Sequence, residues 1–133
     1  MEQHLAVLPI VLPLLAGAAL VLIEDRHHTV KLVINIVATL VLVATGLVLL
    51  AGSTSDPARI IAYQIGDWPA PYGIVLVVDR LSALMVALTS VLALGAIIFS
   101  AARWHRAGQH FHSLFQFLLV GLNGAFLTGD LFN

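Results

Sequence analysis

Four long apolar runs alternate with short polar stretches along this chain. The runs cover residues 5–23, 32–51, 81–102 and 111–127. At 1.5 Å per residue, the runs extend about 26 to 33 Å, which is comparable to the roughly 30 Å of hydrocarbon that a spanning helix crosses. None has the strict alternation of apolar and polar residues that a transmembrane barrel needs. The pattern therefore predicts an all-α membrane protein with four transmembrane helices.

Composition supports this class. Hydrophobic residues make up 60% of the 133 residues and charged residues 10%, whereas a soluble domain averages roughly 45–50% and 25%. A cleaved signal peptide is the rival interpretation of the first run. It is disfavoured because residues 1–4 contain no Lys or Arg and the apolar run is too long for such a peptide.

The basic residues give the orientation. The connections 24–31 and 103–110 hold four of the six Lys and Arg residues, and the connection 52–80 holds only Arg59 and Arg80. Positively charged connections remain in the cytoplasm. We therefore expect 24–31 and 103–110 to be inner loops, with 52–80 and the N-terminus outside.

The outer connection is more than a linker. Its β-branched and aromatic residues at 59–65 favour a short strand, and Gly66, Asp67 and several prolines then interrupt it. A hairpin with residues 74–78 is expected. We interpret its aromatic residues as anchors at the headgroup level, with a docking surface for a partner subunit as the alternative.

Small and polar residues recur at helical spacing inside the runs. Small residues let helix backbones approach closely, and hydroxyl or amide groups find partners there that lipid does not offer. Helix packing is the first interpretation, and a polar ion path is the second. The candidates for either role are Asn35, Thr39, Ser82, Thr89, Asn123 and Thr128.

Three charged residues border the apolar runs. Asp79 precedes the third run in a pattern typical of a helix N-cap, and Arg80 is expected to reach the outer interface or an acidic neighbour. Asp130 follows Gly129 at a predicted corner between two helices. Capping is the first interpretation of Asp130, and attraction of cations to the mouth of an ion path is the alternative.

The remaining residues give no sign of a metal site or an enzyme. The histidines at positions 27, 28, 105, 110 and 112 lie in or beside the predicted inner loops, where we interpret them as solvated or interfacial. They lack a zinc-ligand spacing, and the chain has no cysteine. We find no phosphate-binding loop, no nucleophile with a paired base and no basic nucleic-acid face. No metal, cofactor, catalytic site or nucleic-acid partner is predicted.

Three segments, taken in order, carry a family resemblance. They are YQIGDWPAPYGI at 63–74, VDRLSALM at 78–85 and GLNGAFLTGDLFN at 121–133. Together they resemble the N-terminal part of the D subunit of Mrp-type (multisubunit) monovalent cation/proton antiporters. Those subunits are similar to the antiporter-like membrane subunits of respiratory complex I.

The resemblance implies a longer protein and a transport function. Members have roughly fourteen helices with inverted repeats, and their central Glu and its Lys partner lie beyond Asn133, so no catalytic residue is carried over. We expect a truncated product or part of a longer subunit. The implied function is extrusion of sodium or potassium by inward proton flow across the bacterial inner membrane. Lipid, the remaining helices of the subunit and other antiporter subunits are the implied partners.

Two other functions remain open at this point. One is a proton-translocating membrane subunit of a complex I-like quinone oxidoreductase or a membrane hydrogenase. The other is a stand-alone four-helix structural or assembly protein.

Overall fold

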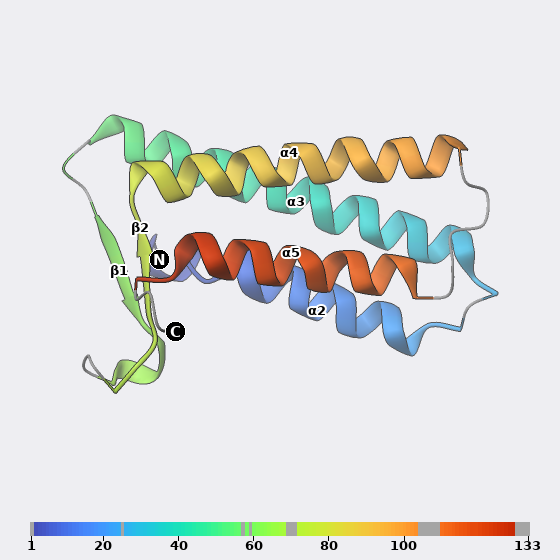
Figure 1. The fold of residues 1–133 in the computed structure, drawn as a ribbon, viewed down its shortest axis with the longest axis horizontal. Coiled ribbons are helices and arrows are strands. Elements are labelled where there is room, and N and C mark those ends of the chain that lie inside the picture. The colour runs from blue at the N-terminus through green and yellow to red at the C-terminus, as the bar shows by residue number, and fades with distance from the viewer. Residues whose placement is uncertain are drawn as a thin grey trace.

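Four antiparallel helices dominate the computed structural model (Figure 1). After a short α1 (Glu2–Leu5), these are α2 (Leu8–Leu22), α3 (His28–Ser55), α4 (Arg80–Arg103) and α5 (Phe111–Leu127). The most extensive contacts pair α3 with α4 and α2 with α5. The mainly helical architecture predicted from the sequence is confirmed. The structure describes residues 2–24, 26–56, 58, 60–68, 72–103 and 110–129.

The helix boundaries differ from the apolar runs at two places. The first run divides into α1 and α2, because Pro9 has no N–H to donate to the carbonyl of Leu5 and instead occupies the first turn of α2. At the second run, α3 begins at His28, so that Lys31 lies inside the helix. The Lys31 side chain is only 4% exposed.

A two-stranded antiparallel hairpin lies at the end of the bundle that holds the N-terminus and the end of α5 (Figure 1). Strand β1 (Ile61–Gln64) pairs with β2 (Val75–Val78) in a register that places Ile61 opposite Val78. A 3-10 turn, η1 (Ile65–Asp67), follows β1, and its Gly66 adopts a φ of 75°. This left-handed conformation favours glycine.

The chain that leaves α5 adds to the hairpin. Thr128 forms a bridge with Leu76, and the N–H of Gly129 donates to the carbonyl of Val75 at 2.8 Å. A Cβ at Gly129 would lie 2.6 Å from the side chain of Val77, so this approach requires glycine. Leu76 and Val78 are buried against the bundle. The hairpin is therefore held against the bundle both by hydrogen bonds to the chain after α5 and by its own buried side chains.

The outer faces of the bundle are apolar. Large hydrophobic residues on the outer faces are widely exposed, for example Leu15 at 63% and Leu92 at 64%. Helices α3 and α4 are long and apolar enough to cross a membrane, and α2 and α5 are shorter apolar helices. Water would disfavour so much exposed apolar surface, whereas lipid would not.

Candidate functional site

A line of buried polar side chains runs between α3 and α5. Asn35 and Thr39 lie one turn apart on the buried face of α3, and both are fully buried. His112 and Gln116 have the same four-residue spacing on α5, which puts them on one face of that helix. Gln116 is 1% exposed and His112 is half-buried. Four polar side chains from two helices thus meet inside the bundle.

Hydrogen bonds join these side chains into a chain. The Nδ2 of Asn35 lies 2.8 Å from Nδ1 of His112, and the Oδ1 of Asn35 accepts a bond from Nε2 of Gln116. Thr39 lies 3.3 Å from the same nitrogen, and its hydroxyl donates to the backbone carbonyl of Asn35 at 2.8 Å. Asn35 is the central residue, because its two amide atoms contact His112 on one side and Gln116 on the other.

One hydrogen-bond acceptor among these four side chains has no donor. The Oε1 of Gln116 is buried and has no hydrogen-bond partner among the residues that the structure describes. A buried amide oxygen without a donor costs about 1–3 kcal/mol. Unsatisfied groups of this kind are uncommon in folded proteins, and Oδ1 of Asn123 on the same helix is the other one among the described residues.

A second buried amide lies near the other end of α5. Asn123 is fully buried, and its Nδ2 donates to the backbone carbonyl of Pro9 at 2.8 Å. In a regular helix that carbonyl would accept the N–H of the residue four positions later, but this residue is Pro13 and has no N–H. Asn123 therefore supplies, from α5, the donor that α2 lacks.

The start of α4 is capped reciprocally. The N–H of Ser82 donates to Oδ1 of Asp79 at 2.8 Å, its hydroxyl donates to the same oxygen at 2.6 Å, and the N–H of Asp79 donates to Oγ of Ser82 at 2.9 Å. This arrangement resembles a capping box. Hydrogen bonds from the Ser82 side chain and backbone hold the pKa of the Asp79 carboxyl below its usual value. Arg80, the first residue of α4, is exposed.

This cap gives a pH-dependent prediction. Because the folded-state pKa of Asp79 lies below the unfolded value, its stabilisation is present above the unfolded pKa and is lost as pH falls through the folded value. Asp79→Ala is expected to lower the free energy of unfolding by about 1 kcal/mol at neutral pH. Denaturant titrations of both proteins between neutral and strongly acidic pH should show this difference vanish. An unchanged difference at the acidic end would contradict the assignment, and Asp79→Asn should retain part of the cap.

The other candidates from the sequence lie apart from the buried chain. Thr89 is half-buried on α4, and Thr128 follows the last residue of α5 and donates its N–H to the carbonyl of Gly124. Asp79 and Ser82 line a groove together with Thr128 and residues near it. Asp130 lies outside the described residues. Within the described ranges, no group of three or more His, Asp or Glu side chains is placed to hold a metal ion.

His112 and Gln116 were not among the candidates derived from the sequence. His112 was interpreted as an interfacial residue, and Gln116 was not singled out. The signal that could have found them was the four-residue spacing of two polar side chains inside an apolar run, which matches the spacing of Asn35 and Thr39.

Apolar helices joined by buried amide and hydroxyl groups define a membrane protein of the helix-bundle class. In sequence and fold, this chain is similar to the antiporter-like membrane subunits. No protein-family model matches the chain. It is 58% identical to the D subunit of a probable K(+)/H(+) antiporter of Rhizobium meliloti, a match that covers 98% of this chain and 25% of that protein. It is 35% identical to the D subunit of the Na(+)/H(+) antiporter of Alkalihalophilus pseudofirmus, covering 98% and 26%.

A solved structure gives the same result. The chain superimposes with a TM-score of 0.87 and 27% identity on part of the Mrp complex from Dietzia sp., covering 97% of this chain and 24% of that one. The resemblance to the D subunit of the multisubunit antiporters is therefore confirmed. The chain spans about a quarter of the length of the relatives it matches.

Proposed function

We propose that this chain is the N-terminal part of the D subunit in a multisubunit monovalent cation/proton antiporter of a bacterial cell membrane. The observation that carries the proposal is the 58% identity to the D subunit of a probable K(+)/H(+) antiporter along almost the whole chain. Inward proton flow would drive sodium or potassium outward. The role is that of a transporter subunit rather than an enzyme.

In this proposal α2 to α5 each cross the bilayer, with the N-terminus and the hairpin outside. The 28 residues of α3 and the 24 of α4 span about 42 and 36 Å at 1.5 Å per residue, which exceeds the hydrocarbon thickness of roughly 30 Å. The 15 residues of α2 and 17 of α5 span only about 22 and 26 Å. Local thinning of the bilayer would accommodate these shorter spans.

The hydrogen-bonded side chains of His112, Asn35 and Gln116 then lie toward the cytoplasmic side. They are close to the connections 24–31 and 103–110, which carry most of the Lys and Arg residues. Asn123 and the Asp79 cap lie toward the outer side. Other antiporter subunits and the remaining helices of the same subunit are the proposed partners. They would cover part of the exposed apolar surface, and lipid would cover the rest.

The proposal predicts cation-dependent proton movement in membrane vesicles. Inverted vesicles containing the complete complex should build a respiratory pH gradient, and added potassium or sodium should dissipate most of it, because cation uptake returns protons to the medium. A pH-sensitive dye reports this directly. Vesicles from a strain in which this chain's gene is deleted are the control.

Two outcomes would contradict the proposal. In one, neither cation changes the gradient although the complex is assembled. In the other, the complex pumps protons only when a quinone or hydrogen is supplied, which would favour the respiratory or hydrogenase-linked alternative.

A further inference from the structure

The chain of hydrogen bonds between α3 and α5 has a defined direction. The Nδ2 of Asn35 can only donate, so Nδ1 of His112 must accept, and the neutral imidazole carries its proton on Nε2. On the other side, Oδ1 of Asn35 accepts from Nε2 of Gln116. The two bonds made by the Asn35 carboxamide therefore point in one direction, from Gln116 through Asn35 to His112. The oxygen of the Gln116 amide is left without a donor among the described residues.

Protonation of His112 is incompatible with this direction. In the imidazolium both ring nitrogens carry hydrogen, so Nδ1–H and the Nδ2 of Asn35 would oppose each other as two donors. Rotation of the Asn35 carboxamide removes the conflict, because its Oδ1 then accepts from Nδ1–H of His112. Its Nδ2 then faces Gln116.

Gln116 has the atom that this second arrangement needs. When its carboxamide also turns, the unpartnered Oε1 takes the place of Nε2 and accepts from Nδ2 of Asn35. The Thr39 hydroxyl lies 3.3 Å from that place and could donate there only by giving up its bond to the Asn35 carbonyl. The same side chains can therefore be hydrogen-bonded in either direction. Neutral His112 favours the direction from Gln116 to His112, and protonated His112 favours the reverse.

We propose that His112 is a proton-binding residue inside the α3–α5 interface, and that its charge sets the direction of the Asn35–Gln116 hydrogen-bond chain. The proton bound at Nδ1 comes from water at the end of the bundle where α5 begins. It leaves by the same route. The site does not depend on the antiporter proposal, although its use in exchange does.

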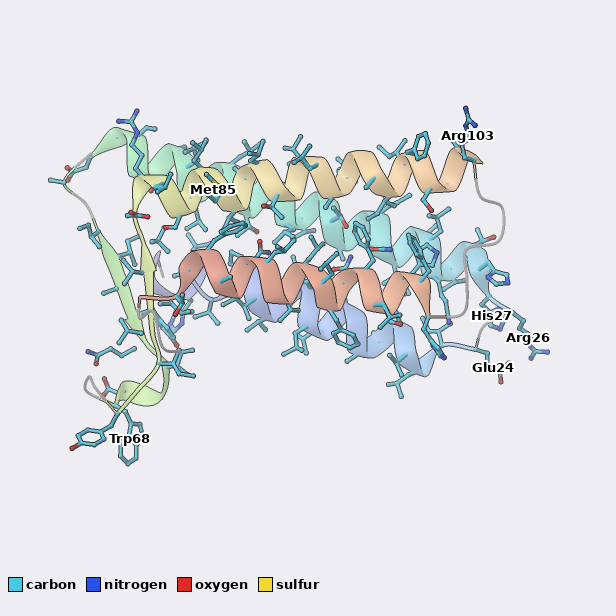
Figure 2. The ribbon with its side chains drawn as sticks, viewed as in Figure 1. Glu24, Arg26, His27, Trp68, Met85 and Arg103 are labelled. Carbon is cyan, nitrogen blue, oxygen red and sulfur yellow. The ribbon has the colours of Figure 1, made fainter. Side chains whose placement is uncertain are left out.

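The surroundings allow a proton to reach His112. It is half-buried and lies two residues after the exposed His110, whereas Gln116 is one turn deeper and almost fully buried. From α3, the titratable groups that interact electrostatically with His112 are Lys31 and His28. Helix α2 has no titratable side chain, and α4 has only Arg103 at this end. Figure 2 places Arg103, Arg26 and His27 at the same end of the molecule.

A nuclear magnetic resonance titration tests the proposal. The complete subunit that contains this chain, labelled with 15N and reconstituted in lipid nanodiscs, would be titrated while the ring nitrogens of His112 and the side-chain NH2 groups of Asn35 and Gln116 are followed. We expect both NH2 signals to shift with the same midpoint as His112. In His112→Gln, which keeps a polar side chain but does not titrate, both shifts should be lost.

Two further variants keep the test decisive. His27→Gln removes an exposed histidine at the same end of the bundle and should leave both shifts intact. Gln116→Leu should leave the Asn35 shift in place, because Asn35 still follows His112. The proposal is overturned if the two amide signals do not move with His112, or if they still move in His112→Gln.

The result is separable from the antiporter proposal. The titration needs neither a cation gradient nor a partner subunit, so its failure would leave the vesicle experiment untouched. If the titration succeeds, His112→Gln in the assembled complex should flatten the pH dependence of exchange relative to His27→Gln. A structural role alone would lower the rate at every pH without changing the shape of the profile.

Discussion

Asn123→Leu is expected to lower the free energy of unfolding by about 1–3 kcal/mol, because it removes the side-chain donor that reaches the carbonyl of Pro9 from α5. That carbonyl lies inside an apolar bundle, where water does not replace the lost hydrogen bond. Unfolding of the reconstituted chain in increasing denaturant, followed by circular dichroism, gives the difference. Leucine has the same branched shape as asparagine and is no smaller, so the substitution leaves no cavity that could account for the effect.

A double-mutant cycle with Pro13→Ala isolates the cause. An alanine at position 13 has an N–H that can donate to Pro9 within α2, so the carbonyl no longer depends on Asn123. In this background Asn123→Leu should cost clearly less than in the wild type. Equal costs in both backgrounds would show that Asn123 acts through something other than this bond.

A matched control is available on the same helix. Gly121 is exposed, and a Cβ there would meet no atom within 4 Å. Gly121→Ala should be neutral or slightly stabilising, because alanine has the higher helix propensity. A loss of stability comparable to that of Asn123→Leu would indicate that α5 tolerates no substitution in this region.

The sequence predicted the elements because their signals are local. Apolar runs of bilayer length located the helices to within a few residues, and the prolines and glycines of the outer connection indicated the hairpin. The split of the first run at Pro9 was also readable in principle, since a proline cannot continue the hydrogen bonds of the preceding turn. Hydropathy by itself does not show this break, because α1 and α2 are both apolar where they meet and read as one run.

The polar site was only half predictable, because it depends on which helices become neighbours. Asn35 and Thr39 were candidates from their spacing on one helix. Their partners His112 and Gln116 lie 77 and 81 positions away and become recognisable only when α5 packs on α3. The pairing of Asn123 with Pro9, 114 positions apart, has the same origin.

The end of α5 illustrates a third kind of limit. Gly129 was predicted to end one helix ahead of a corner, and α5 does end at Leu127. Nothing in the sequence indicated that Thr128 would bridge to Leu76, because an isolated bridge has no periodicity of its own. It arises because the hairpin lies at the same end of the bundle as the end of α5.

Gly46→Ile is expected to have a similarly large effect, lowering the free energy of unfolding by about 2–3 kcal/mol. A Cβ at Gly46 would lie 3.0 Å from the Cα and 3.2 Å from the N of Ala87. These are backbone atoms that cannot rotate away, so α3 and α4 must separate. Close approach through small residues is a main source of helix association in lipid, so the separation also weakens contacts along the rest of this pair.

Gly95→Ile is the matched control for this substitution. Gly95 lies on α4, and its Cβ would meet no atom within 4 Å, so the same change adds the same side chain to an open face. In nanodiscs it should leave stability unchanged or raise it slightly, because isoleucine has the higher helix propensity. Denaturant unfolding of both variants decides the matter: similar losses would mean that the cost reflects the isoleucine itself, and a loss confined to Gly46→Ile would assign it to the contact with Ala87.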